Sequence, residues 1–293
     1  MYDVNFLISN GVDVNKSLEL FGDIDTYNET VGEFLVSAKE KIAKLQKYKD
    51  DKDMPNYAIY VHSLKSDAKY FGFTKLADLA YDQELKSKEG DMFYIYEHYQ
   101  ELIDEVERTI NIVKKYISPE SEVTSNEQVP TSTTPAPAAA PAPVTPAPAA
   151  PLPTSSNIEP AEVYSQKTIL VVDDSNIIRN FVKRIFSEKY NIGMAKDGEE
   201  ALNIIKANAS NENIVAILLD LNMPKVDGFA VLTYMNEHQL FSSMPVSIIS
   251  GDSSKDTINK AFTYPIIDML GKPFTEADVK RVIEKTMYFK ENM

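Results

Sequence analysis

Residues 214–228, IVAILLDLNMPKVDG, carry the clearest structural pattern of the C-terminal half. A run of apolar residues ends in an aspartate and leads into a turn that contains proline and glycine. Such a run is typical of a strand that is buried on both faces of a parallel sheet. Similar apolar runs lie at 169–172 (ILVV), 246–249 (VSII), 266–270 (IIDML) and, more weakly, 190–195 (YNIGMA). Stretches with a helical pattern separate these runs. This alternation predicts a doubly wound α/β domain over residues 167–293.

Polar residues stand at the carboxyl ends of these predicted strands, where doubly wound sheets bind their ligands. They are Asp173, Asp174, Asp220, Ser250 and Lys272. Clustered carboxylates repel one another unless a cation neutralises them, and Mg²⁺ prefers such oxygen ligands. One carboxylate could then attack a phosphoryl group and become an aspartyl phosphate, while the hydroxyl and the ammonium hold phosphoryl oxygens.

Taken singly, these residue types are ordinary, because an aspartate at a strand end commonly caps a helix. We expect Asp197 and Asp227 to be caps of this kind. Only the combination of groups at four strand ends favours a chemical role over a structural one.

Four motifs in this region resemble the receiver domain of two-component response regulators. They are VVDDS at 171–175, LDLNMPKVDG at 219–228, SG at 250–251 and GKPF at 271–274. The resemblance implies a flavodoxin-like sheet of five parallel strands in the order 2-1-3-4-5. It implies Asp220 as phosphoacceptor, Ser250 and Lys272 as groups that hold phosphoryl oxygens, and a cis bond between Lys272 and Pro273. The implied Mg²⁺ ligands are Asp173, Asp174, Asp220 and the backbone carbonyl of Asn222.

Two positions depart from the receiver pattern. Receivers usually carry Tyr or Phe three residues before the lysine, where this chain has Met269, and Pro265 replaces the usual glycine four residues earlier. A flexible thioether has neither a hydroxyl nor a rigid ring that could register two positions, so the usual allosteric switch lacks its residue. Alternatively, Met269 simply packs at the edge of the core and signalling uses other contacts.

The first 118 residues have a helical period instead. Apolar residues recur at helical spacing over 27–45, 61–71, 76–80 and 92–117, and short turns such as DDKDMP and FGFT separate these runs. This pattern predicts an all-α bundle of antiparallel helices over residues 1–118. Residues 119–166 hold eleven of the sixteen prolines and no Gly, Lys or Arg, which predicts a disordered linker between the two domains.

One histidine in the helical half stands in the segment HSLKSDAKYFG, residues 62–72. His62 projects about 150° away from the centre of the apolar face of its predicted helix, so we expect an outward-facing, accessible imidazole. Lys65 and Lys69 lie on the same side, and these cations would favour a phosphorylated imidazole. By itself, a histidine among lysines is usually only part of a solvated helix face.

The same segment resembles the signature of histidine-containing phosphotransfer (HPt) domains, with a lysine three and a glycine ten residues after the acceptor. LELFGDIDTYNETVGEFL at 18–35 and FTKLADLA at 73–80 resemble neighbouring parts of that family. The resemblance implies His62 as a second phosphoacceptor and Lys65, Lys69 and Gly72 as supporting residues. Ser66 replaces the glycine that the family prefers, and Gly72 is expected to end the helix or to allow a close approach.

The composition limits the partners. A net charge of −14 argues against nucleic acid or an anionic membrane as the main partner, and the absence of cysteine excludes disulfides and thiolate chemistry. The N-terminus lacks a signal-peptide pattern, so we expect a cytoplasmic protein without membrane insertion. There is no ATP-binding Gly-rich loop, so we expect a phosphoryl carrier that depends on partners and not an autonomous enzyme.

Together these features predict a two-component phosphorelay protein with Mg²⁺-dependent phosphorylation of Asp220 and His–Asp phosphoryl exchange through His62. The expected partners are a sensor histidine kinase and other receiver or HPt proteins. An alternative keeps the receiver active but makes the helical domain a docking or dimerisation module in which His62 is silent.

Overall fold

The computed structural model describes residues 2–118, 167–210, 213–252 and 254–291. The predicted linker, 119–166, lies outside the described residues. The described residues before and after it belong to one compact unit. Among the helices that the structure describes, none is both long and apolar enough to cross a membrane.

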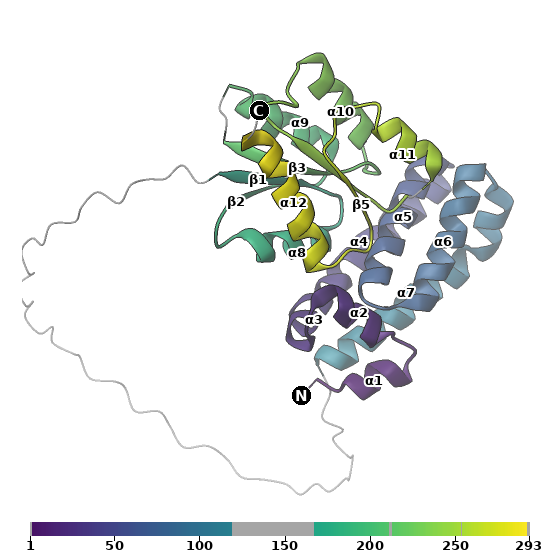
Figure 1. Cartoon of the computed structure of the whole chain (residues 1–293). Helices are drawn as coiled ribbons and strands as arrows, with labels where there is room; N and C mark the ends of the chain where they lie inside the picture. The colour runs from purple at the N-terminus through teal and green to yellow at the C-terminus, as the bar shows by residue number, and fades with distance from the viewer. Residues whose placement is uncertain (1, 119–166, 211–212, 253, 292–293) are drawn as a thin grey trace, which may run out of the picture. The chain divides into compact units, whose positions relative to one another are not determined.

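The N-terminal half is helical, as the sequence predicts (Figure 1). Its helices are α1 (Val4–Ser9), α2 (Val14–Phe21), α3 (Ile24–Val31), α4 (Glu33–Asp50), α5 (Met54–Tyr70), α6 (Thr74–Glu89) and α7 (Met92–Ile117). Five of them begin at an aspartate whose carboxylate accepts a hydrogen bond from a backbone N–H of the first turn. Helices α4 to α7 form the bundle, because each of them packs against two of the others.

Two details of this half differ from the prediction. The structure contains α1 and α2, which the apolar periodicity did not predict. The apolar run over 27–45 is divided between α3 and α4 at Gly32, a residue type with low helix propensity. The buried core is rich in aromatic rings, and Phe71 at the end of α5 packs against Tyr27 and Phe34.

The C-terminal half is a parallel sheet with helices on both faces (Figure 1). Its strands are β1 (Thr168–Val172), β2 (Asn191–Ala195), β3 (Ile214–Asp220), β4 (Val246–Ser250) and β5 (Met269–Gly271). Its helices are α8 (Asn176–Phe186), α9 (Gly198–Asn208), α10 (Gly228–Glu237), α11 (Lys255–Ala261) and α12 (Glu276–Glu291). The strand order β2-β1-β3-β4-β5 confirms the predicted doubly wound fold.

Alternate residues of each strand serve two cores, as the period of two in a strand requires. In β1, Ile169 and Val171 pack with α8 and α12, whereas Leu170 and Val172 pack on the side of α9 and α10. Strand β5 begins only at Met269, later than its apolar run, which follows Pro265. Asp197 and Asp227 accept backbone N–H groups at the starts of α9 and α10, as expected of caps.

Candidate functional site

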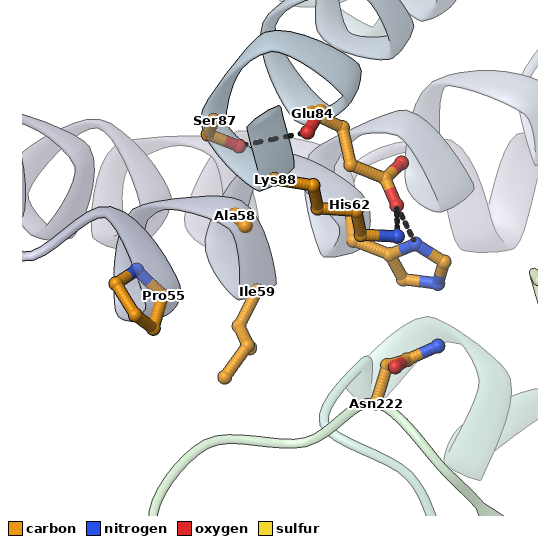
Figure 2. A pocket seen from close by; sticks show the side chains of 8 residues that line it. All are labelled: Pro55, Ala58, Ile59, His62, Glu84, Ser87, Lys88 and Asn222. Atoms are coloured by element: carbon orange, nitrogen blue, oxygen red, sulfur yellow. Dashed lines mark hydrogen bonds and ion pairs between the residues drawn. The ribbon is translucent and has the colours of Figure 1, made fainter. Parts of the chain in front are cut away.

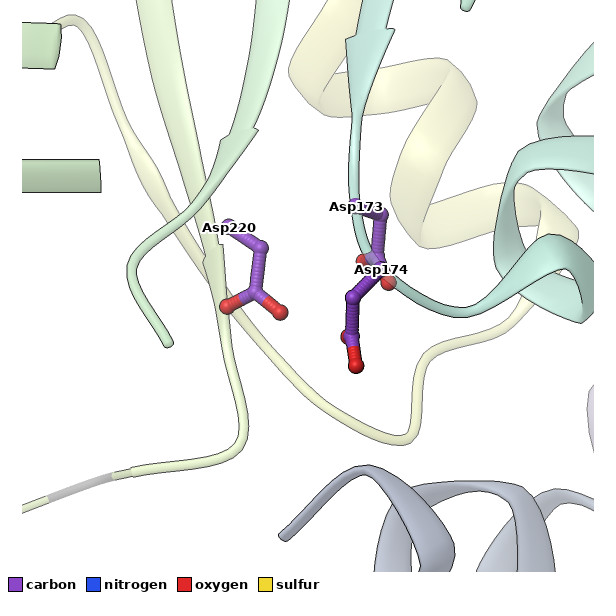
Figure 3. Close-up of side chains that lie close together, drawn as sticks. All are labelled: Asp173, Asp174 and Asp220. Atoms are coloured by element: carbon purple, nitrogen blue, oxygen red, sulfur yellow. The ribbon is translucent and has the colours of Figure 1, made fainter. Parts of the chain in front are cut away.

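Three carboxylates meet at the carboxyl edge of the sheet. Asp173 and Asp174 follow β1, and Asp220 ends the neighbouring strand β3. Each offers an oxygen within 4.8 Å of the others. Figure 3 shows the three side chains close together. Asp173 and Asp220 are fully buried. The structure thus brings together the acidic residues that the strand-end analysis selected.

A single ammonium group lies between two of these carboxylates. Lys272 Nζ is 2.5 Å from Asp220 Oδ2 and 2.7 Å from Asp173 Oδ2, and the bond from Lys272 to Pro273 is cis, as expected. Burial opposes the charge of Lys272, but the charges of Asp173 and Asp220 outweigh it and raise the pKa of the lysine. Burial raises the pKa of Asp173 to about 6, against the opposing charge of Lys272.

The donor set fits a hard divalent cation. Three oxygen donors converge within 4.8 Å and face one paired ammonium, so negative charge is in excess at this edge. The Asn222 main chain is also held here, because its N–H donates to Asp220 Oδ1 at 3.2 Å. Gly228 allows this tight turn, since a Cβ there would collide with the carbonyl oxygen of Asp220.

The other two residues predicted from the receiver resemblance are Ser250 and Met269, and they make different kinds of contact. The carbonyl of Ser250 accepts the Lys272 N–H at 2.8 Å, whereas its hydroxyl is engaged with its own turn and accepts the Asp252 N–H at 3.1 Å. Met269 is half-buried and packs on the core that faces α9 and α10. This packing is the structural alternative that the sequence left open for Met269.

In the helical domain, His62 on α5 is held by a glutamate of the next helix. His62 Nδ1 lies 2.8 Å from Glu84 Oε1, and Lys65 Nζ lies 2.5 Å from Glu84 Oε2 (Figure 2 shows His62 and Glu84). Burial opposes ionisation of Glu84, but hydrogen bonds and charges from His62 and Lys65 hold its pKa below the usual range. An ionised carboxylate can only accept, so Nδ1 carries a proton, and in the neutral tautomer the lone pair is on Nε2.

The expectation of an accessible imidazole was wrong. His62 is only 2% exposed and Lys65 only 5%. The helical wheel placed His62 away from the apolar face, but it could not show that Glu84 of α6 covers one side of the ring and Gly251 the other. Lys69 is half-buried, and burial together with the charge of Lys65 lowers the pKa of Lys69.

Gly72 has the structural role that the sequence suggested. It follows α5 with a φ of 72°, in the left-handed region that glycine adopts without a steric cost. A Cβ at this position would collide with the Asp13 carbonyl oxygen and lie 2.7 Å from Ser17 Oγ. The Asp13 N–H donates to the Gly72 carbonyl at 2.8 Å, so the glycine joins the end of α5 to the start of α2.

The receiver residues and the histidine site meet at one surface. A Cβ added to Gly251 would lie 2.7 Å from His62 Nε2, and Asn222 lines the same pocket of about 320 Å³ as His62 and Glu84 (Figure 2). Within the described part of the chain, His62 Nε2 and Asn222 Nδ2 are buried without a hydrogen-bond partner. Sequence reasoning missed Glu84 and the close approach of Gly251, since no short motif joins positions that are far apart in the chain.

Comparisons with known proteins find the same two domains. The response regulator receiver domain model matches residues 169–284, and the Hpt domain model matches residues 29–111. The probable methanogenesis regulatory protein FilR2 of Methanothrix harundinacea is 30% identical over 124 residues, which are 40% of this chain and 79% of that protein. The two-component response regulator ORR3 of Oryza sativa subsp. indica is 28% identical over 120 residues, 41% of this chain and 89% of that protein.

Solved structures that resemble the chain are also receivers. A response regulator receiver domain protein from Clostridium thermocellum is 25% identical, with a TM-score of 0.39, and the match covers 43% of this chain and 98% of that chain. A CheX-CheY-BeF3-Mg complex from Borrelia burgdorferi gives 30% identity and a TM-score of 0.36, over 40% of this chain and 86% of that chain. On the sequence matches, the chain belongs to the response regulator receiver family, and with its Hpt domain it is a protein of two-component phosphorelay signalling.

Proposed function

We propose that this chain carries phosphoryl groups between Asp220 of its receiver domain and His62 of its Hpt domain. The observation that carries the proposal is the position of His62 Nε2. This nitrogen is buried, has no hydrogen-bond partner within the described residues, and lies against Gly251, the residue after Ser250. A buried nitrogen without a hydrogen-bond partner destabilises the folded state. We therefore expect a ligand or a reacting group to contact this nitrogen at some stage of the reaction.

The receiver step is an attack by a carboxylate oxygen of Asp220 on the phosphorus of a donor. The bond from phosphorus to the leaving group breaks, and the leaving group keeps the electron pair. Lys272 then exchanges its ion pair with Asp220 for one with a phosphoryl oxygen, and the Ser250 hydroxyl turns to another. Asp173, Asp174, Asp220 and the Asn222 carbonyl would hold Mg²⁺, which would neutralise the charge of the carboxylates and of the phosphoryl oxygens.

The histidine step uses the lone pair of His62 Nε2. It attacks the phosphorus of the aspartyl phosphate, and the bond from phosphorus to the Asp220 oxygen breaks with its electron pair returning to the carboxylate. The Nδ1 proton stays in the hydrogen bond to Glu84, whose negative charge balances the positive imidazole ring. The reverse sequence returns the group to Asp220.

The phosphoryl group enters from a partner, for which we propose a sensor histidine kinase, and it leaves to other receiver or HPt proteins. We propose a cytoplasmic location. We also propose domain boundaries at 1–118 and 167–293, with 119–166 as the linker. The matched domain models support both domains but are shorter than these ranges.

The test is a phosphorylation assay on the full chain with Mg²⁺ and a small acyl phosphate donor. We expect acid-stable, base-labile acyl phosphate on Asp220, followed by acid-labile, base-stable phosphohistidine on His62. The Asp220→Asn variant should form neither species, and His62→Gln should form only the acyl phosphate. His98→Gln is the matched control, because His98 lies on α7 of the same domain and is part-exposed.

A wild-type chain that loads Asp220 but never forms phosphohistidine would support the alternative function, a docking module in which His62 is silent. Phosphohistidine at the wild-type level in Asp220→Asn would instead show that the donor reaches His62 without the receiver. Either result contradicts the proposed exchange.

A further inference from the structure

A cluster of aromatic rings joins the two domains. Tyr70 at the end of α5 lies 6.4 Å from Phe181 of α8 and 5.8 Å from Phe274, measured between ring centroids. Phe21 of α2 also lies edge-on to Phe181 at 6.0 Å. All four rings are at most 2% exposed, and they belong to one continuous apolar core. Burial of this kind is typical of a well-packed contact centre.

A buried carboxylate lies beside this cluster. Asp67 is 1% exposed and accepts hydrogen bonds from Ser37 Oγ at 2.5 Å and from Lys41 Nζ, both in its own domain. Its second oxygen, Oδ1, accepts the hydroxyl of Ser175 at 2.8 Å. Ser175 directly follows Asp174 in the receiver pocket. The carboxylate therefore has its full set of partners only when the receiver supplies a donor.

A second polar contact between the domains involves another carboxylate, from helix α4. Glu33, in the first turn of α4, accepts the side-chain amides of Asn176 at 3.2 Å and Asn180 at 3.0 Å, both on α8. Arg179 and Arg184 of the same helix add favourable charge. The backbone N–H of Phe274 donates to the Tyr70 hydroxyl at 3.3 Å.

We propose that the Hpt domain is docked onto the receiver domain of its own chain. Asp67 and Glu33 select this receiver by accepting hydrogen bonds from the Ser175 hydroxyl and from the side-chain amides of α8. The aromatic cluster supplies the apolar contact, and the two carboxylates fix the register. The phosphoryl exchange between His62 and Asp220 that this pairing favours rests on the proposed function. The docking itself does not.

The docked state has a regulatory consequence. It covers part of α8 and places His62 against Gly251, so a kinase or another Hpt domain docks at this surface of the receiver only when the pair opens. Because both domains share one chain, docking is intramolecular and its strength does not depend on protein concentration.

The docking is tested by the distance between spin labels in the full chain without any phosphodonor. The chain has no cysteine, so labels can be attached at Lys39→Cys on α4 and Lys206→Cys on α9, both exposed positions. We expect a single narrow distance distribution. Glu33→Lys should broaden it, because the new ammonium faces Arg179 and Arg184, and Asn180→Asp should broaden it by opposing Glu33 with a second carboxylate.

The double variant, Glu33→Lys with Asn180→Asp, should restore the narrow distribution by exchanging the contact for an ion pair. This rescue separates loss of docking from loss of folding. Asp78→Lys, at an exposed position of α6, is the matched charge-reversal control and should leave the distribution narrow.

A broad wild-type distribution that none of the variants changes would overturn the proposal. So would a short distance between singly labelled chains in a mixture, because that result means pairing between different chains. The phosphohistidine assay decides the proposed function separately. A narrow distance without phosphohistidine leaves docking standing without exchange, whereas phosphohistidine with a broad distance means transfer between undocked domains.

Discussion

The acidic pocket and the histidine site are built in opposite ways. In the receiver, Asp173 and Lys272 directly follow strands of one sheet and Asp220 ends another, and parallel strands bring their carboxyl ends to one edge. In the Hpt domain, His62 depends on Glu84 from another helix and on Gly251 from the other domain. Motifs at the ends of neighbouring strands therefore predict a site, whereas a residue on a helix face acquires its environment from whichever element packs on it.

Lys272 is the residue of the acidic pocket at which we expect the largest effect of a substitution. Lys272→Met removes the ammonium that would pair with a phosphoryl oxygen when Asp220 is phosphorylated. We therefore expect the rate of Asp220 phosphorylation to fall by about 100-fold to 1000-fold. The rate is measured as acyl phosphate formed from a small donor with Mg²⁺. The control is Lys280→Met, an exposed lysine of α12 that pairs with Glu276. An unchanged rate would remove Lys272 from the receiver chemistry.

Glu84 tests the histidine site in the same way. Glu84→Gln removes the charge that balances the positive ring and the partner of buried Lys65, so we expect transfer to His62 to slow by about 10-fold to 100-fold. Loading of Asp220 should keep the wild-type rate. Glu89→Gln, exposed at the end of the same helix, is the control. If loading of Asp220 falls equally, the two sites are not separate in the way proposed.

Gly251 tests the surface at which the two sites meet. Gly251→Ala places a methyl group against an imidazole that Glu84 prevents from moving away, and we expect about a 10-fold slower transfer from Asp220 to His62. Loading of Asp220 by a small donor should change much less. Gly271→Ala is the matched glycine control, because an added Cβ meets no atom within 4 Å there. Equal effects of the two substitutions would contradict the close approach.

The smallest effect concerns pH. The folded state holds the pKa of Glu84 below its ordinary value of 4.5, so the folded state binds this proton less tightly than the unfolded state. The stabilising contribution is therefore complete above pH 4.5 and is lost as the pH falls below it, by roughly 1.4 kcal/mol per pH unit. Urea denaturation of wild type and Glu84→Gln between pH 6 and 3 measures it. A stability difference that does not narrow toward pH 3 would contradict the assignment.

Much of the receiver was predictable from short stretches. The apolar runs predicted the parallel sheet and brought Asp173, Asp174, Asp220 and Lys272 to one place, and the resemblance to receiver domains implied the strand order. The Hpt domain was predictable as a helical bundle, and the spacing of His62, Lys65 and Gly72 identified the segment. The exposure of His62 was not predictable, because a helical wheel describes one helix and not the surfaces packed around it.

The two fold classes, the acidic strand ends and the histidine segment follow from local sequence patterns, because each depends on residues within a few positions of one another. Three contacts depend instead on the folding of distant segments: Glu84 with the imidazole, Gly251 with Nε2, and Asp67 with Ser175. These contacts join residues separated by 22, 189 and 108 positions. Their physical basis is the packing of separate elements into one core, and no local pattern of residue types encodes it.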